Sequence, residues 1–254
     1  MDWPVIGEAT FVGLRNWLTF MNDALAWKAI WNTVLFFLLL YFANDGTRLI
    51  LALLINCGKR GANIFKGIFF LPVVTSFVVI SGIWAWLFKG TEEGFINVVL
   101  HFFGLDTQLF LSSSSQALIV LAGLSIFKVA GSTMIYYYAG LQSIPTMFYE
   151  AAKIDGASSW QLFWKVTFPL LLPIHFYVAI ITTIGSFQIF DSAFLLTSGG
   201  PNYSTTTIVY YLYQEGFTSL RLGYASVLAY VLFFIIFTIS IIQRKFIGEE
   251  VKYN

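Results

Sequence analysis

Long runs of apolar residues, separated by shorter polar connections, dominate the pattern along the chain. A helix needs about 20 predominantly apolar residues to cross a bilayer core of about 30 Å. Five stretches are long enough: 29–55, 68–88, 117–141, 170–196 and 222–243. Because their apolar residues occupy consecutive rather than alternate positions, they predict membrane-spanning helices and not barrel strands.

The composition points to the same class of protein. Charged residues make up 11% of the 254 residues, whereas a soluble domain carries about 25%. Hydrophobic residues make up 58%, aromatic residues 19%, and the mean hydropathy is +0.77. So few charges cannot cover the surface of a soluble fold, and we therefore predict an all-α integral membrane protein. The net charge of +1 gives no global attraction to nucleic acid, so no nucleic-acid partner is expected.

The distribution of lysine and arginine predicts the orientation of the chain. Of the 14 basic residues, eight lie on one side of the five spans, four on the other, and two, Arg48 and Lys128, within spans. Basic residues accumulate on the cytoplasmic side of a membrane. We therefore expect residues 1–28 outside the cytoplasm, the tail 244–254 inside it, and residues 29–243 as the membrane domain.

The connection at 143–169 carries helix signals of its own. Met147, Ala151 and Ile154 recur at the spacing of one apolar helix face. Gly156 stands where a left-handed residue would end that helix. The pattern predicts a short amphipathic helix on the cytoplasmic side.

A second short helix is expected directly after this glycine. Ser158 and Gln161 have the spacing of a capping box, which begins a helix. Its apolar face would hold Trp160, Phe163, Trp164 and Thr167. Exposed apolar faces of this kind require either a protein groove or lipid headgroups, and spacing alone leaves docking and membrane anchoring equally open.

A series of short motifs runs along nearly the whole chain. They are residues 11–17 (FVGLRNW), Asn32-Thr33, Leu71-Pro72, 84–88, 139–145, Glu150-Ala151-Ala152, Asp155-Gly156-Ala157, Thr167-Phe168-Pro169, 196–201 (LTSGGP) and 223–225 (GYA). With these motifs in this order, the chain resembles the permease subunits of binding-protein-dependent ABC importers, in the maltose and glycerol-phosphate branch that transports sugars. An isolated Glu-Ala-Ala triplet would be a weak signal, but the ordered set is a strong one. We refer to residues 143–169 as the EAA loop.

The resemblance implies the type I ABC importer permease core in a bacterial or archaeal cytoplasmic (inner) membrane. Permeases of this branch usually have at least six spans and begin in the cytoplasm, so the five spans predicted here match the family's shared core and leave its first span unmatched. The implied partners are a second permease subunit of the MalG-like kind, two ATPase subunits, an extracytoplasmic solute-binding protein and a carbohydrate substrate. ATP and Mg²⁺ would be used by the ATPase subunits, with no cofactor on this chain.

In such importers each EAA loop sits in a groove of one ATPase subunit. The resemblance assigns this coupling role to six residues: Glu150, Ala151, Ala152, Asp155, Gly156 and Pro169. Glu150 offers a carboxylate at the edge of the groove, the two alanines permit close backbone approach, and Asp155 is expected to cap the amides of the turn.

Polar residues within spans are candidates for the substrate path, because burying them in a membrane is costly. Lys128, Ser132 and Tyr136 share one face of the third span. The fourth span contributes four more polar residues, which run toward its outer end: Thr182, Ser186, Gln188 and Asp191. The resemblance places substrate contacts of the sugar branch on these two spans.

Each of these positions also has a purely structural interpretation. Serine and threonine often bond their own helix, Lys128 could pair with an acid on a partner subunit, and Asp45 with Arg48 reads best as a neutralised pair. His101 and His175 lack companions at metal-ligand spacing, so no metal site is expected.

The sequence predicts a transport subunit rather than an enzyme. It contains no GxxxxGK[ST] phosphate loop, and no grouping of His, Cys and paired acids for chemistry within the membrane. The alternative is a stand-alone secondary transporter or channel, for which we would expect an internal repeat.

Overall fold

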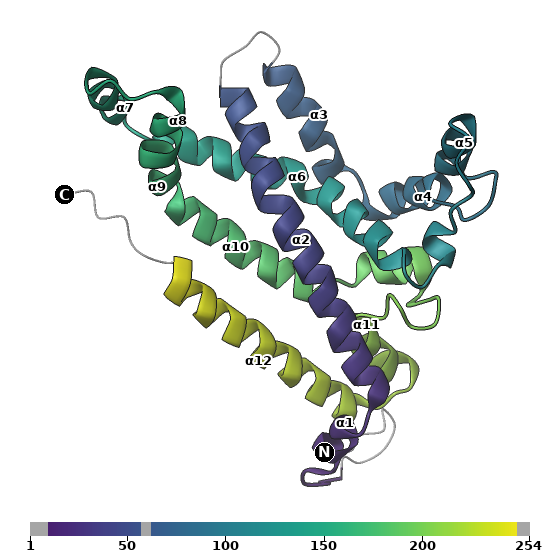
Figure 1. Ribbon diagram of the computed structural model, residues 1–254. Helices are drawn as coiled ribbons and strands as arrows, with labels where there is room; N and C mark the ends of the chain where they lie inside the picture. Colours follow the sequence, from purple (N-terminus) through teal and green to yellow (C-terminus); the bar gives the residue numbers. More distant parts are fainter. Residues whose placement is uncertain (1–9, 57–61, 248–254) are drawn as a thin grey trace. The chain divides into compact units, whose positions relative to one another are not determined.

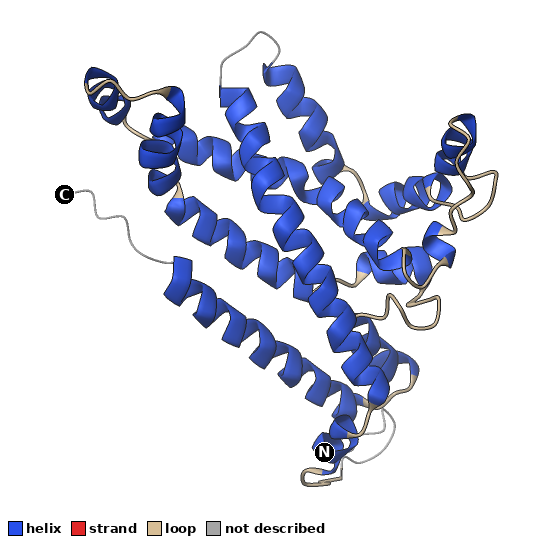
Figure 2. Ribbon diagram, in the orientation of Figure 1, coloured by secondary structure: helices blue, strands red, loops and turns tan. Residues whose placement is uncertain are grey.

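The computed structural model describes residues 10–56 and 62–247, apart from the side chains of 44–47, 62, 63 and 247. These residues form helices and connecting loops, and no strand is found among them (Figure 2). Three predictions fall partly outside this range: those for residues 1–9, for residues 248–254 and for the side chain of Asp45.

Helices succeed one another along the described chain (Figure 1). They are α1 (Arg15–Met21), α2 (Ala24–Asn56), α3 (Ala62–Val74), α4 (Phe77–Leu87), α5 (Phe95–Phe102), α6 (Ala117–Ser143), α7 (Thr146–Ile154), α8 (Ser159–Leu162), α9 (Phe168–Leu170), α10 (Leu172–Phe187), α11 (Ile208–Tyr213) and α12 (Leu222–Ile247). Short 3-10 or π turns add η1 (Phe110–Ser112), η2 (Phe163–Thr167), η3 (Ala193–Thr197) and η4 (Gln214–Thr218).

Within the described residues, three helices are long and apolar enough to cross a membrane alone: α2, α6 and α12. Two broken pairs bring the number to five, namely Ile64–Val74 with Phe77–Leu87, and Ser159–Leu170 with Leu172–Phe187. The prediction of about five spans is thus met only when each pair counts as one span.

The predicted span at 68–88 is not one continuous helix. Pro72 lies near the end of α3 and has no backbone N–H, so the carbonyl four residues earlier loses its usual helical partner. Ser76 is extended, with φ −55° and ψ 136°, and α4 begins after it. The apolar run gives no sign of this break, because every residue around it is compatible with a membrane helix.

The predicted span at 170–196 ends early, at Phe187. The carbonyl of Ile189 lies outside helix α10 and accepts a hydrogen bond from Thr207 Oγ1 at 2.9 Å. The helical path resumes at Asp191, directly before η3. The boundary is set by a tertiary contact that a hydropathy pattern cannot reveal.

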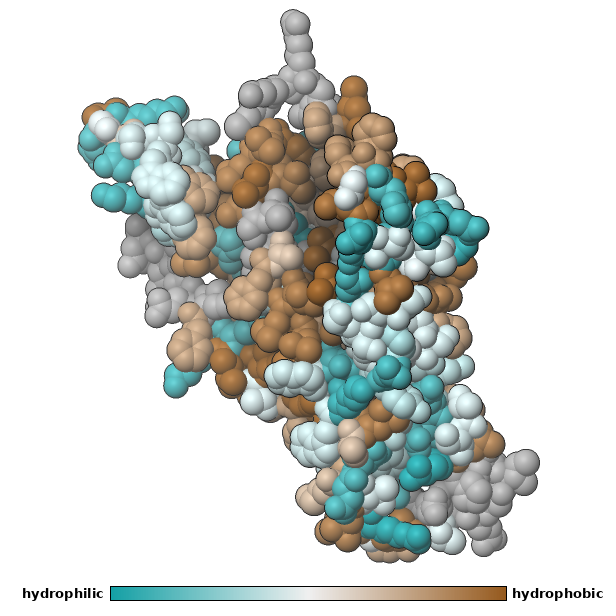
Figure 3. Space-filling model, turned by 45° about the vertical axis from the view of Figure 1, so that its right-hand side comes forward, coloured by the Kyte–Doolittle hydropathy of each residue, from teal (hydrophilic) through white to brown (hydrophobic). Residues whose placement is uncertain are grey.

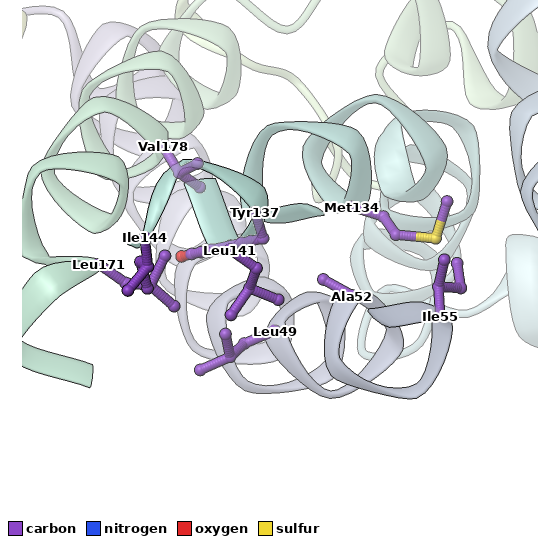
Figure 4. Packing of buried hydrophobic residues seen from close by; sticks show 9 residues of the cluster. All are labelled: Leu49, Ala52, Ile55, Met134, Tyr137, Leu141, Ile144, Leu171 and Val178. Atoms are coloured by element: carbon purple, nitrogen blue, oxygen red, sulfur yellow. The ribbon is translucent and has the colours of Figure 1, made fainter. Parts of the chain in front are cut away.

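The chain forms two compact units. Unit 1 contains Met1–Leu40, Thr75–Ser125 and Ile184–Thr238, and unit 2 contains Tyr41–Val74, Ile126–Thr183 and Ile239–Asn254. The core of unit 1 joins α1, α2, α11 and α12 through Phe20, Ala26, Ala29, Tyr211, Tyr224, Val227 and Leu228. The core of unit 2 joins α2, α6 and α10 through Leu49, Ala52, Ile55, Met134, Tyr137, Leu141, Ile144, Leu171 and Val178 (Figure 4).

The surface of the EAA loop differs in hydropathy from that of the other helices. In the space-filling view, hydrophobic side chains cover much of the visible helical surface, whereas those over α7 and α8 are mostly hydrophilic or neutral (Figure 3). The EAA loop thus differs in surface character from the helices that it joins.

Candidate functional site: the EAA loop and the polar residues of the spans

The EAA loop forms two short helices around a left-handed glycine, as predicted. Gly156 has φ +77°, a conformation that L side chains rarely adopt. Its amide donates to the carbonyl of Lys153 at 3.0 Å, and the amide of Ala157 donates to that of Ala152 at 2.9 Å. These two bonds terminate α7 and turn the chain toward α8.

The predicted capping box at the start of α8 is also confirmed. The amide of Gln161 donates to Ser158 Oγ at 3.3 Å, and the amide of Ser158 donates to Gln161 Oε1 at 2.8 Å. The second helix therefore begins at a position fixed by its own local sequence.

The coupling residues lie at the surface of this turn. Glu150, Ala151, Asp155 and Gly156 are exposed, and Ala152 is half-buried. The expectation that Asp155 caps the turn amides is wrong, because backbone carbonyls already accept the bonds of Gly156 and Ala157. Among the described contacts, the Asp155 carboxylate accepts no bond from those amides, and it is left at the surface.

Large apolar side chains surround the same turn. Met147 is 64% exposed and Ile154 is 87% exposed on α7, and Trp160 on α8 is 71% exposed. The predicted apolar face of the first helix thus points away from the rest of its unit. Such side chains are unfavourable in water and favour a covering partner.

An aromatic series connects the EAA loop with the core of unit 2. The ring of Trp160 lies 5.6 Å from that of Trp164, which lies 5.2 Å from Phe168. Phe168 in turn lies 5.0 Å from His175, whose ring is 4.9 Å from Tyr137. We refer to these five residues as the aromatic series.

One hydrogen bond between side chains joins the two halves of the EAA loop. The hydroxyls of Tyr149 and Thr167 are 3.1 Å apart, which ties α7 to η2. Pro169 lies in α9, two residues before the position at which the helical path bends by 61° between Ser159–Leu170 and Leu172–Phe187.

Lys128 has a contact that the sequence did not reveal. Its Nζ donates to the carbonyls of Pro72 at 2.7 Å and Val73 at 3.0 Å, at the end of α3. Carbonyls in the last turn of a helix lack intrahelical donors, and a positive charge there is favourable. Lys128 therefore caps one side of the break between α3 and α4.

The other predicted path residues have varied surroundings. Ser132 Oγ donates to the carbonyl of Val129 in its own helix at 2.9 Å, as the structural interpretation expected. Tyr136 lies 5.3 Å, ring to ring, from Tyr177. Both remain half-buried on α6, on the same face as Lys128.

The candidates after Lys128, Ser132 and Tyr136 fall into a buried and an exposed set. Thr182 is 9% exposed and Ser186 only 1%. Gln188 and Asp191 are exposed, as is Gly185 shortly before them in the chain. A Cβ on Gly185 would meet nothing within 4 Å, so this glycine faces open space.

Two motif stretches that are far apart in the sequence meet in unit 1. Asn32 Nδ2 donates to the carbonyls of Tyr203 at 2.8 Å and Thr206 at 3.0 Å. The amide of Ile208 donates to Thr33 Oγ1 at 2.9 Å. Asn32-Thr33 therefore holds the turn that follows the LTSGGP motif, a role that sequence reasoning missed.

Asp23 is a second polar anchor that sequence reasoning missed. Its Oδ1 accepts from the amides of Leu25 at 2.9 Å and Ala26 at 3.1 Å, and its Oδ2 from the hydroxyls of Tyr211 at 2.6 Å and Tyr224 at 2.5 Å. Burial alone would raise the pKa of the Asp23 carboxyl, but these hydrogen bonds hold it below its usual value. Burial and the bond to Asp23 raise the pKa of the Tyr211 phenol. An acidic residue directly before a long apolar run was the available signal.

No group of three or more His, Cys, Asp or Glu that could hold a metal ion occurs in the part of the chain that the structure describes. His175 faces Tyr137 and Phe168 rather than other ligand types. The arrangement offers an exposed turn in the EAA loop, a capped end of α3 and polar residues on membrane helices.

Comparison with known proteins identifies this arrangement. The family model described as "Binding-protein-dependent transport system inner membrane component" matches residues 48–246. The sn-glycerol-3-phosphate transport system permease protein UgpA of Escherichia coli (strain UTI89 / UPEC) is 32% identical over 251 residues, 97% of this chain and 83% of the relative. The arabinooligosaccharides transport system permease protein AraP of Bacillus subtilis (strain 168) is 32% identical over 245 residues, 96% of this chain and 78% of the relative.

A solved structure has the same fold. In the crystal structure of a bacterial ABC transporter involved in the import of the acidic polysaccharide alginate, one chain superposes with a TM-score of 0.83 at 25% identity, covering 96% of this chain and 86% of that one. This match and the family match exclude the stand-alone transporter or channel. The chain belongs to the inner membrane components of binding-protein-dependent transport systems, and it is a permease subunit of an ABC importer.

Proposed function

We propose that this permease forms half of a translocation path for a carbohydrate or a related polyol, and that its EAA loop docks on a cytoplasmic ATPase subunit. In this proposal residues 1–28 lie outside the cytoplasm and residues 244–254 inside it, as the positive-inside rule predicts. The chain itself performs no ATP hydrolysis.

The observation that carries the docking proposal is the exposure of Met147, Ile154 and Trp160 around the turn at Gly156. A tight turn that presents three large apolar side chains fits a groove of matching shape better than open water. The exposed carboxylate of Glu150 supplies a polar contact at the rim of such a groove.

The aromatic series offers a physical route for coupling. A displacement of Trp160 or Trp164 by a moving ATPase would be transmitted through Phe168 to His175, because packed rings resist compression. His175 and Tyr137 belong to the membrane helices α10 and α6. Closure of the ATPase subunits would in this way move the helices of unit 2.

The proposed partners follow from the family. They are a second, MalG-like permease subunit, two ATPase subunits that bind ATP and Mg²⁺, and an extracytoplasmic solute-binding protein. A structural relative of this chain was solved in complex with an alginate pentasaccharide-bound periplasmic protein, which supports the last of these.

The substrate proposal rests on the relatives, whose names concern sn-glycerol-3-phosphate, arabinooligosaccharides and alginate. All three are polyhydroxylated. We assign Gln188 and Asp191 as the first polar contacts, since both are exposed and follow shortly after Gly185, which faces open space. Hydroxyl groups of a sugar can donate hydrogen bonds to the Asp191 carboxylate, and they can both donate to and accept from the Gln188 side-chain amide.

The docking proposal is tested with Ile154→Glu in the assembled transporter, with Lys165→Gln as the control at an exposed polar position of η2. A buried charge in an apolar groove is costly. We expect the amount of ATPase that co-purifies with Ile154→Glu to fall about tenfold and uptake to be lost, with membrane insertion unchanged. Lys165→Gln should retain both.

Unchanged co-purification and uptake with Ile154→Glu would contradict the docking proposal. Loss of uptake with full ATPase binding would favour the anchoring interpretation instead. Gly156→Val gives a second test, because valine is strained at φ +77°. We expect it to abolish uptake and leave insertion intact.

A further inference from the structure

Helix α5 is amphipathic, and one of its faces is uncovered within its unit. Phe95, Val98, Val99 and Phe102 are spaced at i, i+3, i+4 and i+7, so they share one face. They are 45%, 53%, 40% and 85% exposed, respectively. Phe103, 71% exposed, extends this face beyond the helix and meets Phe102 edge to face at 5.4 Å.

The opposite face of α5 is fixed by a buried amide. Asn97 is fully buried, and its Nδ2 donates to the carbonyls of Lys89 at 3.1 Å, Thr91 at 2.9 Å and Gln108 at 2.9 Å. The amide of Gln108 donates back to Asn97 Oδ1 at 2.9 Å. All these polar groups are satisfied, so α5 is held in one rotation about its axis and its apolar face has a defined direction.

This face continues the apolar surface of a membrane helix. On α4, the exposed residues Val78, Val79, Ile83 and Trp86 lie in a helix pair that is apolar enough to cross a membrane. The ring of Trp86 lies 5.4 Å from that of Phe95. Tryptophan and other aromatic residues concentrate where the hydrocarbon meets the headgroups.

The charged residues around α5 are mostly acidic. Lys89 and Glu93 form an ion pair at 2.6 Å, and both are exposed. Glu92 and Asp106 are exposed on the connections before and after the helix. There is thus no excess of basic residues that would select anionic lipids, and the attraction to a membrane would come from the apolar face.

We propose that α5 lies in the membrane interface, with Phe95, Val98, Val99 and Phe102 inserted at the boundary between headgroups and acyl chains. The occupant of this surface is the phospholipid bilayer. A short helix so placed ends the α3–α4 span with an anchor in the plane of the membrane.

The test measures the surroundings of this face in the complete transporter, in vesicles of phosphatidylethanolamine and phosphatidylglycerol. In a Cys57→Ser background, a spin label is attached to Phe102→Cys, to Val98→Cys, or to the control Asp106→Cys. Oxygen concentrates in the hydrocarbon and a nickel chelate in water. We expect relaxation at positions 98 and 102 to respond several-fold more to oxygen than to nickel, and the reverse at 106.

Equal nickel accessibility at 98, 102 and 106 would overturn the proposal, since the face would then be in water. Protection of 98 and 102 from both reagents would also overturn it, because a protein partner would cover the face. The two label positions serve as replicates, and retained uptake of each labelled transporter confirms that it has folded.

Discussion

The phenol hydroxyl of Tyr137 and Nδ1 of His175 lie 2.8 Å apart and join α6 to α10 in the core of unit 2. Nε2 of the same imidazole is buried without a hydrogen-bond partner. The phenol is therefore the polar contact that makes this histidine tolerable in an apolar core. Because Phe168 also packs against the imidazole, this bond holds the residue through which the aromatic series reaches Tyr137.

Tyr137→Phe should destabilise the transporter and weaken coupling. An unsatisfied buried polar group costs about 1–3 kcal/mol, so we expect the Tm of the purified complex to fall by several degrees. The ATP hydrolysed per solute imported should rise, since His175 is no longer held against the phenol. Thermal denaturation and parallel uptake and ATPase assays measure both effects.

Tyr177→Phe is the matched control for this variant. Tyr177 is 47% exposed and meets Tyr136 through its ring rather than through a bond of its hydroxyl among the described contacts. Removal of the Tyr177 hydroxyl should leave both the Tm and the ATP hydrolysed per solute unchanged. A Tyr137→Phe complex with the Tm and ATP cost of the unaltered complex would show that the hydrogen bond has no such role.

The sequence predicted the EAA loop well because the signals there are local. The capping box at Ser158 and the left-handed Gly156 act within four residues, and both are present in the structure. The aromatic series was not predictable in this way, since Phe168 meets His175 and His175 meets Tyr137 only after two helices have packed. Periodicity reports which face is apolar but not what lies against it.

Lys128 shows the same limit in the membrane spans. A lysine in an apolar run identifies a costly group with a role. Its partners, the carbonyls of Pro72 and Val73, lie more than 50 residues away in the chain and carry no charge that a search for ion pairs could detect. The sequence could therefore single out the residue but could not name its contacts.

Lys128→Met should destabilise the C-terminal end of α3. Two carbonyls lose a charged donor, which costs about 1.5–3 kcal/mol for such a bond. We expect a lower Tm of the purified complex and a reduced rate of uptake. Lys128→Arg, which keeps the charge and has several donors, should retain much of both. If Lys128→Met changed substrate preference at an unaltered Tm, the lysine would line the path and would not serve as a cap.

Asp23 should make stability depend on pH at the acid end. Its folded pKa is below the ordinary value of 3.8, so its contribution is complete above that value and is lost as the pH falls through the folded pKa. Asp23→Ala removes the bonds to Leu25 and Ala26 at the start of α2, and loss of such a cap costs about 1 kcal/mol.

The measurement is the Tm of the Asp23→Ala complex and of the unaltered complex, from pH 7 down to pH 3. We expect a constant difference near neutral pH that narrows below about pH 3.8. Asp106→Ala, at an exposed position, is the control and should show no difference. If the difference in Tm stayed constant down to the lowest pH, the charge of Asp23 would contribute nothing to stability, and only the size and shape of its side chain would matter.

Gly131 lies where α6 passes close to the backbone of α3. A Cβ at this position would lie 2.1 Å from the carbonyl oxygen of Phe69, which is backbone and cannot rotate away. Gly131→Ala must therefore separate the two helices within unit 2, at a typical cost of about 1–3 kcal/mol for overpacking. Gly67 lies in the same helix α3, and a Cβ there would meet nothing within 4 Å. Gly67→Ala should be neutral or stabilising, because alanine favours a helix by about 1 kcal/mol over glycine. Equal Tm values for the Gly131→Ala and Gly67→Ala complexes would refute the close packing of α3 on α6.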